Sequence, residues 1–363
     1  MNQVRPAAVA GMFYPRDARE LESQVAELID GVENLAPRFG HPKALIVPHA
    51  GYIYSGAVAA RAYDELSAAR GVVKRVVLLG PVHRVPVRGL ALPGAEAFDT
   101  PLGRVPVDAE AVRMLAPYRQ VVVSPEAHAQ EHSLEVQLPF LQKMLGEFTL
   151  VPLAVGDAKT QEVREVIERL WGGTETLFVL STDLSHYHAY DEARAIDRET
   201  LSRIAGFGTD INHEEACGAT PLNGLLAAAK ARGLSMRLLG ACNSGDTAGG
   251  KDRVVGYAAF ALYEGERVSL EDAGEALLGI AREAIGQGLG VQAQAPRSDS
   301  APWLTRPGAT FVTLQLEGKL RGCIGSLSAT RGLGEDVAWN AQSAALRARG
   351  VGALTRQAVA FRR

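Results

Sequence analysis

Short apolar runs alternate with amphipathic stretches over most of this 363-residue chain. Runs that are apolar throughout are typical of strands covered on both faces. The short apolar runs, several of them apolar throughout, predict strands at residues 44–47, 75–79, 120–123, 148–155, 177–181, 236–240 and 254–262. Apolar positions at helical spacing predict helices between them at residues 19–31, 56–69, 133–145, 161–170, 191–205 and 221–232. This alternation favours an α/β fold with a central, mainly parallel sheet flanked by helices.

The pattern changes near residue 265. Beyond it, the sequence predicts a helix, a loop of small and polar residues and a hairpin of two strands, at residues 271–285, 292–302, 309–316 and 319–324. We therefore expect two domains, residues 1–265 and residues 268–363, the second a smaller α+β unit. The length agrees, since 363 residues exceed what one core usually holds.

Composition narrows the class of protein. Hydrophobic residues make up 47% and charged residues 22%, as in an ordinary globular protein. The net charge of −3 argues against a general nucleic-acid or membrane-surface binder. No apolar run reaches the ~18 residues of a membrane span, and the N-terminus lacks the apolar core of a signal peptide. The sparse, odd set of Cys217, Cys242 and Cys323 fits a reducing compartment, so we expect a cytoplasmic protein.

Histidine follows three of the predicted strands: His49, His83 and His186 come shortly after the runs that end at residues 47, 79 and 181. In an open α/β sheet, ligands bind at the loops after the carboxyl ends of parallel strands. The three histidines therefore predict a shared metal or proton-transfer site. Each one alone is equally well explained as a buried, hydrogen-bonded side chain.

Two further residues fit such a site. Asp183 precedes His186 by three residues and could orient it or share its proton, although a helix-capping aspartate beside an exposed histidine is the alternative. Cys217 lies just before a predicted helix N-terminus, where the helix dipole is expected to lower the pKa of a thiol and favour metal binding. The alternative for Cys217 is a small buried residue under a turn.

Glu131 and His132 stand at the start of a predicted helix and could face the same cleft. With His128 they match the H-x-x-E-H pattern of one class of zinc proteases. That site requires both histidines on one face of a helix, whereas the helix is predicted to begin near His132. The protease interpretation is therefore weaker. Residues 244–251 form a glycine-rich loop without the spacing of a phosphate-binding loop, and are predicted as a surface or lid loop.

At these residues the chain resembles the Memo family, over about residues 4–263. The motifs, in the family's order, are Pro48-His-Ala-Gly-Tyr, Leu79-Gly-Pro-Val-His83, Glu131-His-Ser, Ser181-Thr-Asp-Leu-Ser-His186 and Ala216-Cys-Gly-Ala-Thr-Pro221. That family is similar in fold to the LigB-type extradiol dioxygenases. The resemblance implies metal ligands at His49, His83 and Cys217, with candidate catalytic residues His186, Asp183 and His132 around them. Two imidazoles and a thiolate suit iron(II), which we expect, or copper or zinc.

The ligand set limits the activity that this resemblance implies. Ring-cleaving dioxygenases use two histidines and a carboxylate, whereas a cysteine takes the carboxylate's place here. We therefore expect a metal-dependent redox reaction on an unidentified small molecule or oxygen species, and not ring cleavage as such. The alternatives are a non-catalytic binding or scaffold module that keeps the pocket, and a zinc-dependent hydrolase with Glu131 or His186 as general base.

The second unit resembles the AMMECR family, on Leu320-Arg-Gly-Cys-Ile-Gly-Ser326 and on segments near residues 308–313 and 340–345. Fusions of the two families in prokaryotes are associated with a radical SAM protein, which the resemblance makes a candidate partner. Arg321 and Cys323 could line a pocket, or the glycines could serve only a tight hairpin turn. The family pattern is lost after about residue 347, so we expect a partial, truncated domain.

Overall fold

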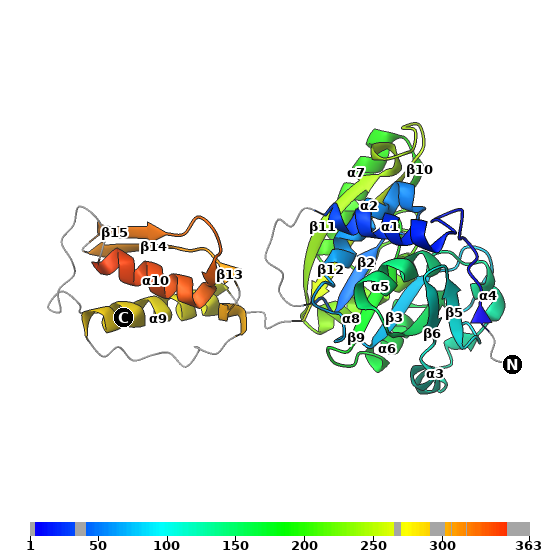
Figure 1. Ribbon diagram of the computed structural model, residues 1–363, viewed down its shortest axis with the longest axis horizontal. Helices are drawn as coiled ribbons and strands as arrows, with labels where there is room; N and C mark the ends of the chain where they lie inside the picture. The colour runs from blue at the N-terminus through cyan, green and yellow to red at the C-terminus, as the bar shows by residue number, and fades with distance from the viewer. Residues whose placement is uncertain are drawn as a thin grey trace. The chain divides into compact units, whose positions relative to one another are not determined.

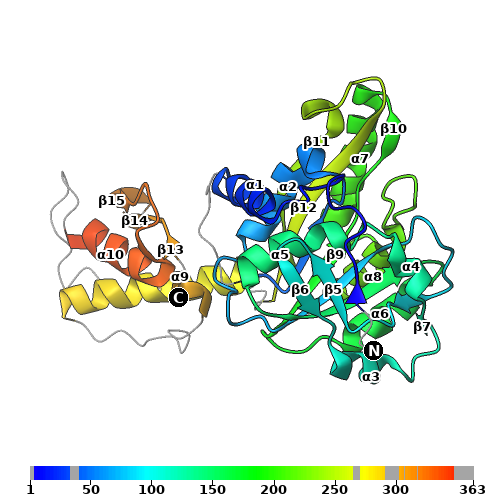
Figure 2. The ribbon, with the colours of Figure 1, turned by 45° about the vertical axis from the view of Figure 1, so that its right-hand side comes forward.

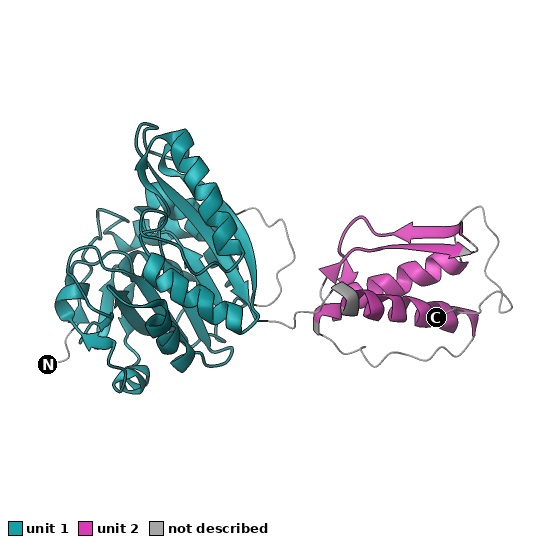
Figure 3. Ribbon diagram, turned by 180° about the vertical axis from the view of Figure 1, so that it is seen from behind, with its two compact units in different colours: residues 1–34, 40–265 teal, residues 35–39, 266–363 magenta. Residues whose placement is uncertain are grey.

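The computed structural model describes residues 4–32, 41–264, 270–290, 302–305, 307–316 and 318–346. The chain divides into two compact units: residues 1–34 with 40–265, and residues 35–39 with 266–363 (Figure 3). The predicted boundary at residues 265–268, most of the loop predicted at 292–302 and the predicted loss of the family pattern after residue 347 lie outside the described residues. No helix in the described ranges is long and apolar enough to cross a membrane.

A large mixed sheet forms the centre of unit 1 (Figure 1). Its strands in spatial order are β10 (His186–His188), β12 (Val254–Tyr263), β2 (Ala44–Val47), β9 (Thr176–Ser181), β3 (Arg75–Pro81), β8 (Thr149–Val155), β4 (Leu90–Leu92) and β7 (Val121–Val123), with β11 (Ser235–Asn243) paired to β12. The central strands β2, β9, β3 and β8 pair in parallel, while β12 runs antiparallel to β2, β10 and β11. The predicted α/β fold is confirmed, and its parallel centre explains why those runs are apolar throughout.

Helices cover both faces of this sheet because alternate strand residues point to opposite sides. In β2, Leu45 and Val47 join one apolar core and Ala44 and Ile46 join the other. The first core receives α1 (Ala18–Asp30), α2 (Tyr52–Asp64) and α5 (Leu138–Leu145), which lie together on one side in Figure 2. The second receives α3 (Ala109–Leu115), α6 (Thr160–Arg169), α8 (Ala219–Ala231) and the end of α7 (Tyr190–Ala205).

The structure differs from the prediction mainly in short elements. A separate sheet of β1 (Val4–Arg5), β5 (Ala97–Thr100) and β6 (Gly103–Pro106) was not predicted, and neither was α4 (Pro125–Ala129). Strands of two to four residues carry too little periodicity to be recognised, and β1 pairs with β5 more than 90 residues away. The helix predicted at residues 133–145 begins later, as the 3-10 turn η1 (Glu135–Gln137) followed by α5.

Unit 2 consists of two packed helices, one of which lies against a hairpin. It contains α9 (Leu270–Leu289), η3 (Pro302–Thr305), β13 (Pro307–Gly308), β14 (Phe311–Leu316), β15 (Lys319–Gly325), β16 (Arg331–Gly332) and α10 (Leu333–Leu346). The predicted hairpin is confirmed, since β14 and β15 pair antiparallel. A cavity of about 500 Å³ in this unit is lined by neither Arg321 nor Cys323.

A buried carboxylate holds the loops of unit 2 together. Asp336 is fully buried and accepts hydrogen bonds from the backbone N–H and the hydroxyl of Thr310, from the Ser326 hydroxyl and from the Asn340 amide, at 2.6–3.0 Å. These residues lie in or beside the segments that carry the AMMECR resemblance. Their part in the described structure is to fix the turns around the hairpin.

Candidate metal centre

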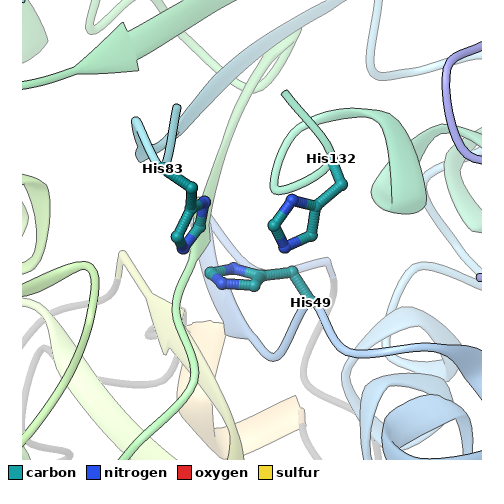
Figure 4. A group of neighbouring side chains, drawn as sticks. All are labelled: His49, His83 and His132. Atoms are coloured by element: carbon teal, nitrogen blue, oxygen red, sulfur yellow. The ribbon is translucent and has the colours of Figure 1, made fainter. Parts of the chain in front are cut away.

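Three histidines meet beyond the carboxyl ends of the central strands (Figure 4). His49 follows β2, His83 follows β3, and His132 lies between α4 and η1. One ring nitrogen of each lies within 4.8 Å of those of the other two. Neutral imidazole is a common metal ligand, so this cluster could hold a metal ion.

The cluster opens into a pocket of about 780 Å³. Its lining contains all of the site residues predicted from the sequence: His49, His83, His132, Asp183, His186 and Cys217. Aromatic side chains complete the wall, among them Phe13, Tyr54, Tyr187 and Tyr257. Tyr187 has a φ of 64°, in the left-handed region where a non-glycine residue is strained.

The ring of His49 is held in one tautomer. Its Nδ1 lies 2.8 Å from the Ser181 hydroxyl, which gives its only proton to the carbonyl of Ser133 at 2.6 Å and also accepts from the amide of Gln137 at 2.9 Å. Because that hydroxyl has no further proton, Nδ1 of His49 must be the donor. Burial lowers the pKa of His49 well below its usual range. Its Nε2 therefore faces the pocket as an acceptor, 3.3 Å from Sγ of Cys217.

Glu131 orients the other two histidines. Its Oε1 accepts from Nδ1 of His83 at 2.8 Å and lies 3.4 Å from Nδ1 of His132, and its Oε2 accepts the backbone N–H of His83 at 2.7 Å. Burial would raise the pKa of Glu131, but the bonds from His83 and Ser133 and the charge of His132 lower it to about 2. A carboxylate in this position fixes the rings of metal-binding histidines. Glu131 was predicted to face the cleft, but its orienting role was not predicted.

Burial also keeps His132 neutral, since it lowers the pKa of that ring to about 4. The rings of His83 and His132 stack with their centroids 4.5 Å apart. The ring of Phe13 also packs against His132, with a centroid distance of 4.8 Å. His132 was predicted as a candidate catalytic residue. The structure makes it a candidate ligand as well, because its nitrogen joins those of His49 and His83.

Asp183 and Cys217 come together across two loops. The backbone N–H of Asp183 lies 3.3 Å from Sγ of Cys217, and the backbone N–H of Cys217 donates to the carbonyl of Asp183 at 3.2 Å. This close approach requires glycine at position 218, where a Cβ would lie 2.8 Å from Thr182. As a result, Sγ of Cys217 lies 3.3 Å from Nε2 of His49.

The electrostatics of these two residues follow from burial. Burial raises the pKa of Asp183 to about 7, although its Oδ1 accepts the backbone N–H of His49 at 2.7 Å. Burial and the charge of Asp183 raise the pKa of Cys217 to about 12. The expectation that the helix dipole lowers this pKa is therefore wrong for the metal-free chain, because desolvation outweighs the dipole.

His186 stands at the start of β10 on the wall of the same pocket. Its Nδ1 lies 2.8 Å from the carbonyl of Leu184, which can only accept, so Nε2 carries the free lone pair. Burial lowers the pKa of His186. A neutral ring with an unprotonated Nε2 can take a proton from a bound molecule.

The structure contradicts the interpretation of His128, Glu131 and His132 as an H-x-x-E-H zinc site. His128 lies in α4 with 1% of its surface exposed, and its Nε2 lies 2.7 Å from the carbonyl of Ala91. It does not line the pocket that contains His132. Because α4 ends at Ala129, His132 lies outside the helix that carries His128, and the two histidines share no helix face.

Comparisons with known proteins identify the family. A family model described as Memo-like protein matches residues 5–261. This chain belongs to the Memo family. A second model, AMMECR1, matches residues 278–359, so an AMMECR1 domain follows the Memo domain. The prediction that this second domain is partial stays a prediction.

Relatives of similar length to the first domain support the assignment. MEMO1 family proteins of Methanopyrus kandleri, Aquifex aeolicus and Ignicoccus hospitalis are 37%, 36% and 38% identical over 286, 268 and 280 residues. These matches cover 70–72% of this chain and 97–99% of each relative. Among solved structures, an uncharacterised protein of Escherichia coli K12 matches with a TM-score of 0.42 and 14% identity, over 61% of this chain and 99% of that one.

Proposed function

We propose that this Memo family protein is a metal-dependent oxidoreductase that holds iron(II) with His49, His83 and Cys217 and acts on a small molecule or an oxygen species. The observation that carries the proposal is the contact between Sγ of Cys217 and Nε2 of His49, 3.3 Å apart, in the pocket that also contains His83. A thiolate beside two imidazoles suits iron(II), and also copper and zinc. Bound iron would supply an electron-transfer and Lewis-acid centre.

The two histidines suit a cation because of how their partners hold them, and Cys217 adjoins them through His49, although the group of mutually close ligand atoms contains His132 in its place. His49 and His83 direct their Nδ1 atoms to Ser181 and Glu131 at 2.8 Å, so the Nε2 atom of each ring is the one that can face a cation. Cys217 is protonated when no cation is present, and metal binding displaces such a proton. The backbone N–H of Asp183 then supports the sulfur charge from 3.3 Å.

The remaining polar residues handle protons. Nε2 of His186 accepts a proton from the bound molecule, and its ring is held by the carbonyl of Leu184. Asp183, whose pKa burial raises to about 7, exchanges a proton near neutral pH. His132 offers Nε2 to the same space, and we assign it to proton transfer because Cys217 supplies the third ligand.

A zinc-dependent hydrolase is the weaker alternative. It needs a general base that can take a proton from water. Both oxygens of Glu131 already accept hydrogen bonds, and its pKa of about 2 makes it a poor base. Of the two candidates, only His186 could act as the general base, because its Nε2 is not used by the bond from Nδ1 to the carbonyl of Leu184.

Metal analysis of anaerobically purified protein tests the proposal. We expect about one iron per chain in the wild type, and at least about a tenfold loss in His49→Ala and Cys217→Ser. His188→Ala, which changes a histidine on the pocket wall that pairs with Glu192, is the matched control and should keep its iron. Equal metal content in all variants would refute the site. Loss in His132→Ala with retention in Cys217→Ser would assign the third ligand to His132.

Turnover is tested separately. Iron-loaded protein should consume oxygen or an added reductant, and His186→Ala should slow this reaction without loss of iron. An iron-loaded protein with no redox turnover would favour a binding or scaffold module. We further propose a cytoplasmic location, which agrees with the free thiols of Cys217, Cys242 and Cys323, and a radical SAM protein as partner, which co-purification from the native host would test.

A further inference from the structure

A second pocket, of about 310 Å³, lies between α7 and the end of β11, which stand side by side in Figure 1. Tyr257 lines both this pocket and the metal pocket. Leu184 also lines it, and the carbonyl of Leu184 is the group that holds His186. The pocket is therefore next to the candidate metal centre but shares none of its proposed ligands.

Two exposed arginines on one face of α7 line this pocket. Arg194 and Arg198 are four residues apart, which places them one helical turn from each other. The guanidinium of Arg194 lies 5.5 Å from the ring centre of Tyr190. Within the described part of the chain, neither arginine forms a hydrogen bond or an ion pair closer than 4.0 Å. Their donor groups are available to a ligand.

The acceptors of the pocket are already in use. Asp246 accepts the hydroxyl of Tyr190 and the backbone N–H of Asn243, the latter at 3.0 Å. Asp197 accepts the backbone N–H of Ser185 at 3.0 Å, and burial raises the pKa of Asp197, which favours its neutral form. The side-chain oxygen of Asn243 accepts a backbone N–H at 2.9 Å, which leaves its amide nitrogen as a further donor on the pocket wall.

A pocket with unused donors and occupied acceptors selects a ligand rich in acceptors. We propose that it binds a small anion through a carboxylate or phosphate group, held by Arg194 and Arg198 with the amide of Asn243 as third donor. Guanidinium forks bind both groups with two parallel hydrogen bonds. The nearby charge of Asp246 opposes this binding, but the hydroxyl and N–H bonds that it accepts offset part of that charge. This site goes beyond the proposed function and does not depend on it.

Calorimetric titration with inorganic phosphate and with malonate, at constant ionic strength, tests the site and separates its two ligand classes. We expect one saturable site for at least one of these anions. The double variant Arg194→Gln/Arg198→Gln should weaken binding at least about tenfold, since each arginine supplies a charged hydrogen bond. Arg164→Gln, which removes a guanidinium on α6 that already pairs with Glu168, should leave the affinity unchanged.

Two further measurements keep the result unambiguous. His49→Ala should bind the anion as the wild type does, whereas an anion that sits on a metal in the other pocket would lose its site. Circular dichroism checks that the double variant is folded. If the double variant does not fold, the single variant Arg198→Gln is titrated in its place. The proposal is overturned if neither anion binds saturably, if the arginine variants bind with unchanged affinity, or if only His49→Ala abolishes binding.

Discussion

Substitution of Ser181 should weaken metal binding without touching a ligand. In Ser181→Ala, Nδ1 of His49 loses its acceptor at 2.8 Å, and the carbonyl of Ser133 loses its donor at 2.6 Å. The amide of Gln137 keeps a second acceptor, the carbonyl of Pro48 at 2.9 Å. The damage is therefore concentrated on His49, whose side chain is only 2% exposed.

The magnitude follows from the role of Ser181. Loss of a hydrogen-bond partner behind a metal-binding histidine typically costs 10–100-fold in metal affinity, which is about 1.4–2.7 kcal/mol. The unpaired, buried Nδ1–H should also lower the free energy of unfolding of the metal-free protein by about 1–3 kcal/mol. His49 should no longer be confined to the tautomer with its proton on Nδ1.

Chelator competition measures the metal affinity, and nitrogen NMR shifts of His49 in the metal-free protein report its tautomer independently of activity. Ser202→Ala, which changes an exposed serine on α7, is the control and should alter neither quantity. If Ser181→Ala kept both the wild-type affinity and the single tautomer, the reasoning from the hydroxyl's one proton would be wrong.

Three other perturbations follow from the packing. Gly218→Ala places a methyl group 2.8 Å from Thr182 and should displace Cys217, so both the melting temperature and metal content should fall, whereas Gly250→Ala, with open space around it, should change neither. His128 is buried with its pKa lowered to about 4, so below about pH 6.5 the unfolded chain binds a proton that the folded chain does not; denaturant titrations should show up to about 3 kcal/mol less stability at pH 4, and less of this loss in His128→Gln. Asp336→Ala leaves several hydrogen-bond donors without their acceptor and should unfold unit 2 while unit 1 keeps its metal. Limited proteolysis should then cleave unit 2 of the variant faster than that of the wild type, and an equally resistant unit 2 would contradict the role given to that carboxylate.

The sequence was informative where burial alone decides the pattern. The runs that form β2, β3 and β9 are apolar throughout because helices cover both faces of the sheet. Since parallel strands present their carboxyl ends at one edge, the placement of His49 and His83 after β2 and β3 was enough to predict that they lie in one pocket.

Only the tertiary structure could supply the partners of these side chains. Glu131 orients His83 across 48 residues, Ser181 fixes His49 across 132, and Sγ of Cys217 reaches His49 across 168. Hydrogen bonds of this kind depend on angles and distances that local periodicity does not carry. The pKa of Cys217 is the clearest case: its place before a helix N-terminus predicts a lowered value, and its burial against Asp183 raises it instead. Sequence thus determined which residues gather at the sheet edge, and three-dimensional packing decided their protonation and their orientation.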